Sequence, residues 1–190
     1  MIPFNYLGPV FKIFASLIYP EKFKEDLFSL SREIDEDGYV LDSGSGTGIL
    51  SRFLHGVRKD LKFILLDPAP GMLKYAPGFT AKVVGMAESL PFRDRSLAAV
   101  MIGDAFHHFN DPDRAVREMH RVLGTSGILL IFEIDHEKIV GRFIARIEKV
   151  LGEPARFFSP PDLKAKLEAN GFTCRISRYT WRYALMGKRN

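Results

Sequence analysis

The sequence contains almost no cysteine. Cys174 is the single cysteine among 190 residues. Disulfide frameworks need pairs of cysteines, structural zinc sites use at least two thiolates, and iron–sulfur clusters use three or four. Cys174 also lies in a strand-like stretch, which favours a small core residue over a nucleophile. The composition therefore excludes disulfide-stapled and iron–sulfur proteins, and it is consistent with a reducing cytoplasm, where we expect the protein to reside.

The sequence also lacks an apolar run long enough to cross a membrane. The longest such run near the N-terminus covers residues 13–19, whereas a membrane span requires roughly 20 residues. The first residues carry no basic segment of the kind that opens a signal peptide, and Lys12 interrupts the apolar pattern. We therefore expect neither a membrane span nor a signal peptide.

Charge of one sign is concentrated in the C-terminal part. The net charge is +4, but residues 137–190 hold 12 basic against 5 acidic side chains, so the rest of the chain is net negative. These basic residues are spread out instead of forming the dense cluster of a nucleic-acid-binding tail. Most of them are expected to form a solvated surface, and a small molecule is expected as partner ahead of nucleic acid.

The chain does have enough apolar material for one large core. Hydrophobic residues make up 46% and charged residues 26%, a profile typical of a globular protein. A length of 190 residues fits one domain with at most an appendage. From residue 38 onward, continuous apolar runs alternate with helical patterns, as in a parallel sheet covered on both faces. The pattern predicts a doubly wound α/β domain over residues 38–190, preceded by a helical arm over residues 1–37.

Local signals place the elements of this domain. Asp111 followed by Pro112 predicts the start of a helix that reaches about residue 123, and Ser159 predicts the start of another that reaches residues 170–171. Two β-rich runs after it are expected to close the sheet as an antiparallel pair. The expected strands are 39–42, 63–67, 82–85, 97–102, 128–132, 172–179 and 181–186, and shorter helices are expected at 49–54 and around 72–76.

The most informative segment is a glycine-rich turn between the first strand and the first helix. It reads Asp42-Ser43-Gly44-Ser45-Gly46-Thr47-Gly48, and in a doubly wound sheet this turn faces the ligand crevice. Glycine lets the backbone approach a ligand closely and adopt a positive φ. No Lys-Ser/Thr pair follows the glycines, which excludes a P-loop. Asp67 ends the second strand, where a carboxylate can accept hydrogen bonds from ribose hydroxyls.

Two nucleotide cofactors fit this turn to different degrees. A dinucleotide site favours Gly-x-Gly-x-x-Gly, whereas the third glycine here comes one residue early. Asp42 would repel a pyrophosphate but would attract the sulfonium and ammonium of S-adenosylmethionine (SAM). The turn therefore favours SAM over NAD.

Several segments in order resemble class I SAM-dependent methyltransferases. The branch that resembles this chain most is the ubiquinone/menaquinone biosynthesis type, and the resemblance covers about residues 38–188. It rests on the glycine-rich turn, on Asp67 with the following Met72-Leu73 pair, and on later landmarks that include residues 85–92, 105–111, 118–127 and 158–172. The resemblance implies a Rossmann-like, mostly parallel seven-stranded sheet of order 3-2-1-4-5-7-6 with strand 7 antiparallel.

The same resemblance implies a set of cofactor contacts. Asp42 and the turn would flank the methionine part, Asp67 would bind the ribose, and Asp104 with Ala105 would lie beside the sulfonium. The full implied set is Asp42, Gly44, Ser45, Gly46, Thr47, Gly48, Asp67, Pro68, Met72, Met86, Ala87, Glu88, Asp104 and Ala105. The sequence departs from the family pattern in three places. The family often has Asp at the positions of Met86 and Ala98, and it has Lys-Pro-Gly-Gly where this chain has Gly124-Thr125-Ser126-Gly127. Cofactor binding is expected to survive these departures.

Methyl transfer is a direct displacement, so the chemistry demands alignment and exclusion of water more than a nucleophilic side chain. His108 and Asp104 are candidates for a base or for a contact to the acceptor. His107 and His108 have no clustered partner in the sequence, so we expect no metal.

The first hypothesis is a SAM-dependent methyltransferase acting on a small, apolar acceptor. An RNA or protein methyltransferase that uses the basic C-terminal part and a non-catalytic SAM-binding protein stay as alternatives, and an NAD oxidoreductase ranks last.

Overall fold

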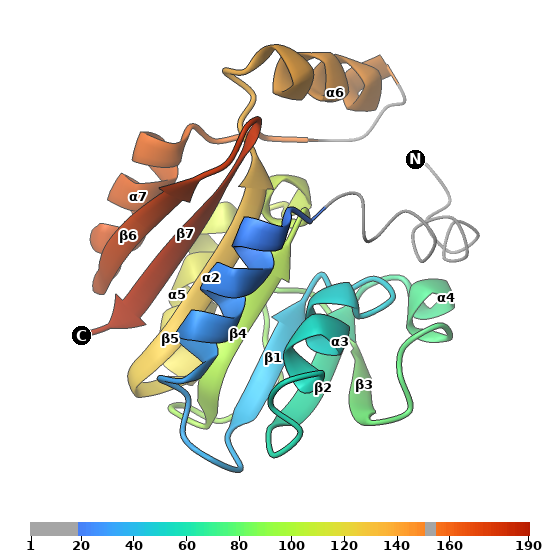
Figure 1. The fold of residues 1–190 in the computed structure, drawn as a ribbon, viewed down its shortest axis with the longest axis vertical. Coiled ribbons are helices and arrows are strands. Elements are labelled where there is room, and N and C mark those ends of the chain that lie inside the picture. Colours follow the sequence, from blue (N-terminus) through green and yellow to red (C-terminus); the bar gives the residue numbers. More distant parts are fainter. Residues whose placement is uncertain (1–18, 151–154) are drawn as a thin grey trace.

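A single seven-stranded sheet forms the centre of the molecule (Figure 1). The computed structural model describes residues 19–150 and 155–190. The strand order is β3-β2-β1-β4-β5-β7-β6, and the neighbouring pairs from β3 to β5 are parallel. β7 runs antiparallel to both β5 and β6. The order and the antiparallel strand that the resemblance implied are confirmed.

The strands lie close to their expected positions, with one correction in the fifth. The strands are β1 Tyr39–Ser43, β2 Lys62–Asp67, β3 Thr80–Val84, β4 Leu97–Gly103, β5 Leu123–Ile134, β6 Phe172–Arg178 and β7 Arg182–Arg189. Residues 123–127 were expected to end a helix and form a loop, but they belong to β5. Leu123 pairs with Leu97, and an irregularity in the register between Leu97 and Ala99 accommodates the extra residues.

The helices begin largely where the capping signals predict. They are α2 Glu21–Ser31, α3 Ile49–His55, α4 Pro70–Leu73, α5 Pro112–Val122, α6 Ile139–Val150 and α7 Pro160–Glu168, with a 3₁₀ turn η1 at Phe106–His108. The Asp111 side chain accepts a hydrogen bond from the Arg114 backbone N–H at 3.0 Å, and Ser159 Oγ accepts one from Asp162 at 3.3 Å. α7 ends at Glu168, before residues 170–171, and α4 lies earlier than the expected 72–76.

Helices cover both faces of the sheet. Alternate residues of a strand point to opposite faces, so Val40 belongs to the core that includes α2 and α3, and Leu41 to the core that includes α5 and α7. Figure 1 shows α2 and α3 in front of the sheet, and α6 beyond the upper end of β5, outside these layers. The carboxyl ends of the parallel strands therefore lie between the covering layers and α6.

The described part of the N-terminal arm is packed into the front core. Phe23 and Leu27 of α2 are buried, and the ring centroid of Phe23 lies 4.0 Å from that of Phe132 on β5. The aromatic residues Phe4, Phe11 and Phe14 of the arm lie outside the described residues. The division of the chain at residues 37 and 38 stays a prediction.

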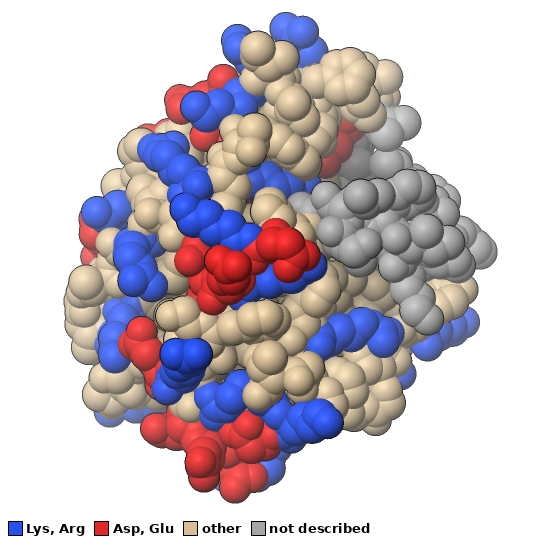
Figure 2. All heavy atoms as spheres, in the orientation of Figure 1, with Lys and Arg blue, Asp and Glu red and all other residues tan. Residues whose placement is uncertain are grey.

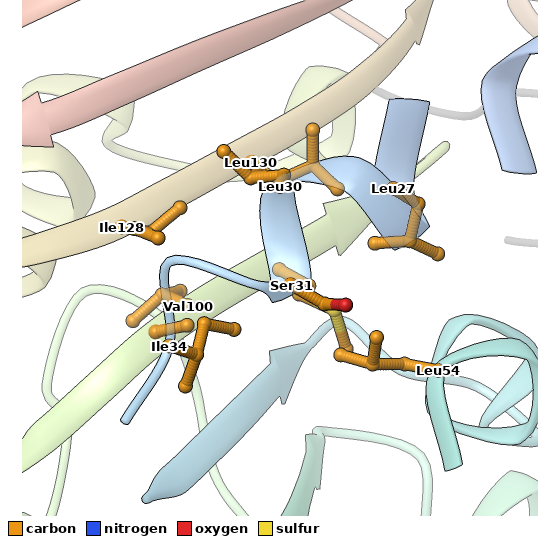
Figure 3. A pocket seen from close by; sticks show the side chains of 10 residues that line it. Leu27, Leu30, Ser31, Ile34, Leu54, Val100, Ile128 and Leu130 are labelled. Carbon is orange, nitrogen blue, oxygen red and sulfur yellow. The ribbon is translucent and has the colours of Figure 1, made fainter. Parts of the chain in front are cut away.

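A small recess between α2 and the sheet is apolar and lies away from the glycine-rich turn (Figure 3). It is lined by Leu27, Leu30, Ser31, Ile34, Leu54, Ala99, Val100, Met101, Ile128 and Leu130. The Ser31 hydroxyl donates to the carbonyl of Phe28 at 2.7 Å, so it is already satisfied by its own helix. We interpret the recess as a feature of core packing. Among the described helices, none is long and apolar enough to cross a membrane.

Candidate functional site

The loop between β1 and α3 has the backbone that its glycines predict. Gly44, Gly46 and Gly48 have φ values of 67°, 53° and 77°, in the left-handed region that disfavours residues with a Cβ. A Cβ on Gly44 would lie 2.5 Å from Ala105 Cβ, and one on Gly48 would lie 2.5 Å from Leu65 Cδ2. The loop is therefore held tightly between the end of β4 and the side chains of β2, and glycine is required at both positions.

Asp67 fixes this loop from the end of β2. Its Oδ2 accepts a hydrogen bond from the Gly46 backbone N–H and its Oδ1 accepts one from Ala69, both at 2.8 Å. Burial raises the pKa of the Asp67 carboxyl above its ordinary value, while these two backbone bonds act in the opposite direction. A carboxylate has about four acceptor positions, so Asp67 can also accept hydrogen bonds from ribose hydroxyls.

Asp42 is a buried carboxyl beneath the same loop. Its Oδ2 accepts hydrogen bonds from the backbone N–H and the hydroxyl of Ser51, at 3.2 and 2.8 Å. Burial raises the pKa of Asp42 to about 7, with Ser51 lowering it and the charge of Asp67 adding to the rise. A cation near Asp42 would therefore be stabilised, since it would offset the cost of ionising a buried acid.

The loop also offers polar groups that fit SAM. The hydroxyls of Ser45 and Thr47 are buried and have no hydrogen-bond partner among the described residues. Buried polar groups normally have partners, so these two orphaned hydroxyls favour a polar ligand over an apolar one. The loop therefore suits a ligand that carries hydroxyl groups and positive charge. Its backbone allows close approach, and it presents the hydroxyls of Ser45 and Thr47 beside the carboxyls of Asp42 and Asp67. SAM has both hydroxyl groups and positive charge.

The residues expected around the adenine differ in burial and in what they contact. Met72 is buried, and its Cε would lie 3.2 Å from a Cβ on Gly46, so it contacts the turn. Ala87 is buried, whereas Met86 and Pro68 are exposed. Glu88 Oε1 accepts hydrogen bonds from the backbone N–H groups of Asn110 and Asp111, at 2.8 and 3.2 Å. Glu88 therefore anchors the loop before α5, a role that the sequence analysis did not anticipate.

On the other side of the turn, Asp104 follows β4 in a strained conformation. Its φ is 51°, which is uncommon for a residue other than glycine. Burial raises the pKa of Asp104, partly opposed by the charge of Arg182. The Arg182 guanidinium donates to Asp104 Oδ1 and lies between two rings, with 4.2 Å to the centroid of Trp181 and 5.2 Å to that of Phe132. Backbone strain of this kind is concentrated at functional sites.

His107 joins a buried row of charged groups. Its Nδ1 lies 2.6 Å from Glu133 Oε2 on β5, and its Nε2 lies 3.7 Å from Glu148 Oε2 on α6. Burial alone would lower the pKa of His107, but Glu133, Glu148 and Asp104 more than offset this, so the pKa is raised. Glu133 Oε1 also accepts a hydrogen bond from the Phe106 backbone N–H at 2.8 Å. The row therefore fixes η1 between β5 and α6.

Sequence reasoning missed three charged residues around Asp104 and His107: Glu133, Glu148 and Arg182. It also predicted that the two histidines have no metal-ligating side chain near them. This prediction is wrong, because ligand atoms of His107, His108 and Glu148 all lie within 4.8 Å of one another. The expectation that no metal binds there stays a prediction. Elsewhere, burial raises the pKa of Cys174 to about 11, which makes this half-buried thiol a poor nucleophile.

Comparison with known proteins finds related sequences. Residues 41–131 match the family model described as a methyltransferase domain. The demethylmenaquinone methyltransferase of Thermotoga maritima is 34% identical over 116 residues, which cover 60% of this chain and 50% of that protein. The ubiquinone/menaquinone biosynthesis C-methyltransferase of Hahella chejuensis is 33% identical over 146 residues, covering 65% and 59%. The chain thus spans about half the length of these curated relatives.

Solved structures confirm the fold. The methyltransferase-like protein of Haloferax volcanii, solved in complex with the Trm112 methyltransferase activator, has a TM-score of 0.82 at 17% identity, covering 97% of this chain and 96% of that one. A SAM-dependent methyltransferase from Thermotoga maritima has a TM-score of 0.77 at 20% identity, covering 99% and 98%. Together with the family match, these findings show that the chain has the fold of class I SAM-dependent methyltransferases and that its sequence resembles the ubiquinone/menaquinone biosynthesis type.

Proposed function

We propose that this chain transfers a methyl group from SAM to a small, apolar acceptor by direct displacement. The observation that carries the proposal is the close approach of Gly44 to Ala105, where a Cβ on the glycine would lie 2.5 Å from the alanine Cβ. This approach joins the glycine-rich turn to the segment that carries Asp104 and His107. One edge of the sheet thus holds a cofactor side and an acceptor side next to each other.

The cofactor side is proposed to use the residues that the resemblance implied. Asp42 would favour the positive charge of the ligand, Asp67 would accept hydrogen bonds from the ribose, and the orphaned hydroxyls of Ser45 and Thr47 would gain partners. The remaining proposed contacts are Gly44, Gly46, Gly48, Pro68, Met72, Met86, Ala87, Glu88, Asp104 and Ala105. SAM, when bound, supplies a methyl group on a positively charged sulfur, which an electron-rich acceptor atom can take in one displacement.

The proposed acceptor side contains three titratable groups to consider for taking a proton from the acceptor: Asp104, His107 and His108. His107 is poorly suited because its ring lies between the carboxylates of Glu133 and Glu148, which raise its pKa and favour the protonated form. Asp104 is better suited: burial raises the pKa of its carboxyl, and the charge of Arg182 favours the ionised form. We therefore assign proton removal to the Asp104 carboxylate where the acceptor needs it. His108 is the other candidate.

The apolar character of the acceptor is supported by the aromatic rings around this side. Phe157 stacks on His107 with 4.5 Å between ring centroids, and the rings of Phe106 and Phe158 lie 5.6 Å apart. Relatives named for demethylmenaquinone and for ubiquinone/menaquinone biosynthesis suggest an acceptor class, a substituted quinol ring. A cytoplasmic setting, consistent with the single cysteine, is part of the same proposal.

The test is a methyl-transfer assay with isotopically labelled SAM and several acceptors. We expect label on a small hydroquinone, and little on RNA or on proteins from an extract. Asp104→Asn should lower kcat about 100-fold, the effect of losing a general base, and should change the Kd of SAM much less than it changes kcat. Transfer to RNA with a steep salt dependence, and none to small acceptors, would contradict the proposal.

A further inference from the structure

The outer face of α6 carries an unusual concentration of exposed apolar side chains. Eleven large hydrophobic side chains are exposed among the described residues, and five of them belong to this one helix. The five are Ile139, Val140, Phe143, Ile147 and Val150, with exposed fractions from 43% to 86%. At 3.6 residues per turn they fall within an arc of about 100°. We refer to these five side chains as the apolar stripe of α6.

The opposite face of α6 holds the helix against the rest of the molecule. Gly141 packs directly on the backbone of Asp135, where a Cβ would clash with the carbonyl oxygen. Glu148 Oε2 lies 3.7 Å from His107 Nε2. Both residues lie about half a turn away from the centre of the apolar stripe. The stripe therefore points outward because of how the helix is attached.

Basic side chains border the stripe. Arg142 and Arg146 lie on the helix next to the edge formed by Ile139, and Lys138 immediately precedes the helix. All three are exposed, and none of the ion pairs between described residues includes them. Figure 2 shows the top of the molecule, where α6 lies in Figure 1, as largely uncharged surface with basic atoms beside it and some acidic atoms at its left. The surface thus combines exposed apolar area with positive charge that forms no ion pair with another described residue.

We propose that α6 docks on the surface of an anionic lipid bilayer, with the apolar stripe in the interfacial region and Lys138, Arg142 and Arg146 against lipid phosphates. A helix with an apolar face and a basic border is the type that lies in the plane of a membrane interface. α6 has 12 residues, whereas a span needs about 20, so the helix lies on the bilayer and does not cross it.

Charge decides between a bilayer and other occupants of this surface. In a dimer formed through this surface, like charges on the two copies would face each other across the apolar stripes, which opposes association. An anionic bilayer offers apolar volume and negative charge together. Because α6 is attached to the row of His107 and Glu133, docking would bring the acceptor side of the sheet to the membrane. This inference goes beyond the proposed function and does not depend on it.

The test is flotation of the full chain with lipid vesicles, without SAM or acceptor. We expect binding to vesicles of mixed phosphatidylcholine and phosphatidylglycerol, with binding falling as salt rises, and weak binding to phosphatidylcholine alone. Replacing Ile139→Ser with Phe143→Ser should lower the vesicle partition coefficient about tenfold. Arg142→Glu with Arg146→Glu should lower it about as much and abolish its salt dependence.

Matched variants elsewhere on the surface serve as controls. Val57→Ser with Tyr75→Ser removes exposed apolar area, and Lys59→Glu with Arg93→Glu reverses exposed charge, so both pairs should bind vesicles like the wild type. The proposal fails if the wild type does not float with the mixed vesicles, or if the α6 variants bind as well as the controls. It also fails if sedimentation shows a stable dimer that Phe143→Ser dissociates, since the stripe would then be a contact between copies.

Discussion

The two regions that we propose as the cofactor side and the acceptor side of the sheet edge are built in different ways. On the cofactor side, Asp67 and Asp42 accept hydrogen bonds from backbone groups and a serine hydroxyl, and glycines provide the close approach. On the acceptor side, charged side chains pair with one another: Asp104 with Arg182, and His107 with Glu133. The first side is shaped by local conformation and the second by ion pairs between distant elements.

This difference implies that the two sides respond differently to substitutions. A site shaped by backbone conformation fails when a Cβ is added, while conservative changes of neighbouring charges affect it little. A site held by buried ion pairs fails when one charge is removed, because the partner is left buried and uncompensated. The following substitutions test each half of this comparison, beginning with the largest expected effect.

Glu133→Gln should have the largest effect on stability. It leaves His107 without its nearest carboxylate, and breaking a buried pair costs about 3–5 kcal/mol. The folded-state pKa of His107 is raised from 6.5, and that of Glu133 is lowered from 4.5. The stabilisation by His107 is therefore lost as pH rises through its folded pKa, and that by Glu133 as pH falls through its own.

The loss of stability in this variant should consequently be largest between about pH 4.5 and 6.5 and smaller above that window. Urea unfolding of both proteins across this range measures it. An equal loss at every pH would show that the pair is not ionised and would remove the charge-based half of the comparison.

Gly44→Ala should destabilise the fold by about 3 kcal/mol. The added Cβ meets Ala105 Cβ at 2.5 Å and φ is 67°, so overpacking adds to the cost of a left-handed conformation. Gly78→Ala is the matched control, because a Cβ there meets nothing within 4 Å. Thermal unfolding compares the two. If both variants unfold like the wild type, the loop is not constrained in the way we describe.

Asp42→Asn should have a smaller effect on the free energy of unfolding, and it should stabilise the fold instead of destabilising it. Because the folded pKa is raised from 3.8 to about 7, stability that is fully present below the unfolded pKa is lost as pH rises through 7. The shift sets an upper limit of about 4 kcal/mol, and we expect a gain of about 1–2 kcal/mol for the variant at alkaline pH, because Asn keeps part of the bonding to Ser51. Urea unfolding at about pH 5 and pH 8 tests this. A variant less stable than the wild type at both values would contradict it.

The two sides also differ in how far the sequence predicts them. The proposed cofactor side can be predicted because the residues that form it lie close together in the sequence: a strand, closely spaced glycines and an acid at the end of the next strand. Likewise, Asp111 and Ser159 predict helix starts because capping is a local interaction. By contrast, His107 and Glu133 are 26 positions apart, and Asp104 and Arg182 are 78 apart.

Three features could not be predicted for the same physical reason. Whether His107 or His108 points inward depends on Glu133, which the sequence does not place opposite either of them. The early start of β5 depends on the pairing of Leu123 with Leu97. The anchoring of the Asn110 backbone by Glu88 depends on the packing of two loops. In each case a long-range contact decides between local alternatives of similar energy.

The central claim is that the loop between β1 and α3, together with Asp67, binds SAM. Calorimetric titration of the wild type and of Asp67→Ala with SAM, its demethylated product and NAD tests it most directly. We expect the wild type to bind SAM and the demethylated product but not NAD, with SAM binding at least about tenfold weaker in the variant, the loss of one or two charge-assisted hydrogen bonds. Binding of NAD with no binding of SAM or its demethylated product would contradict the account.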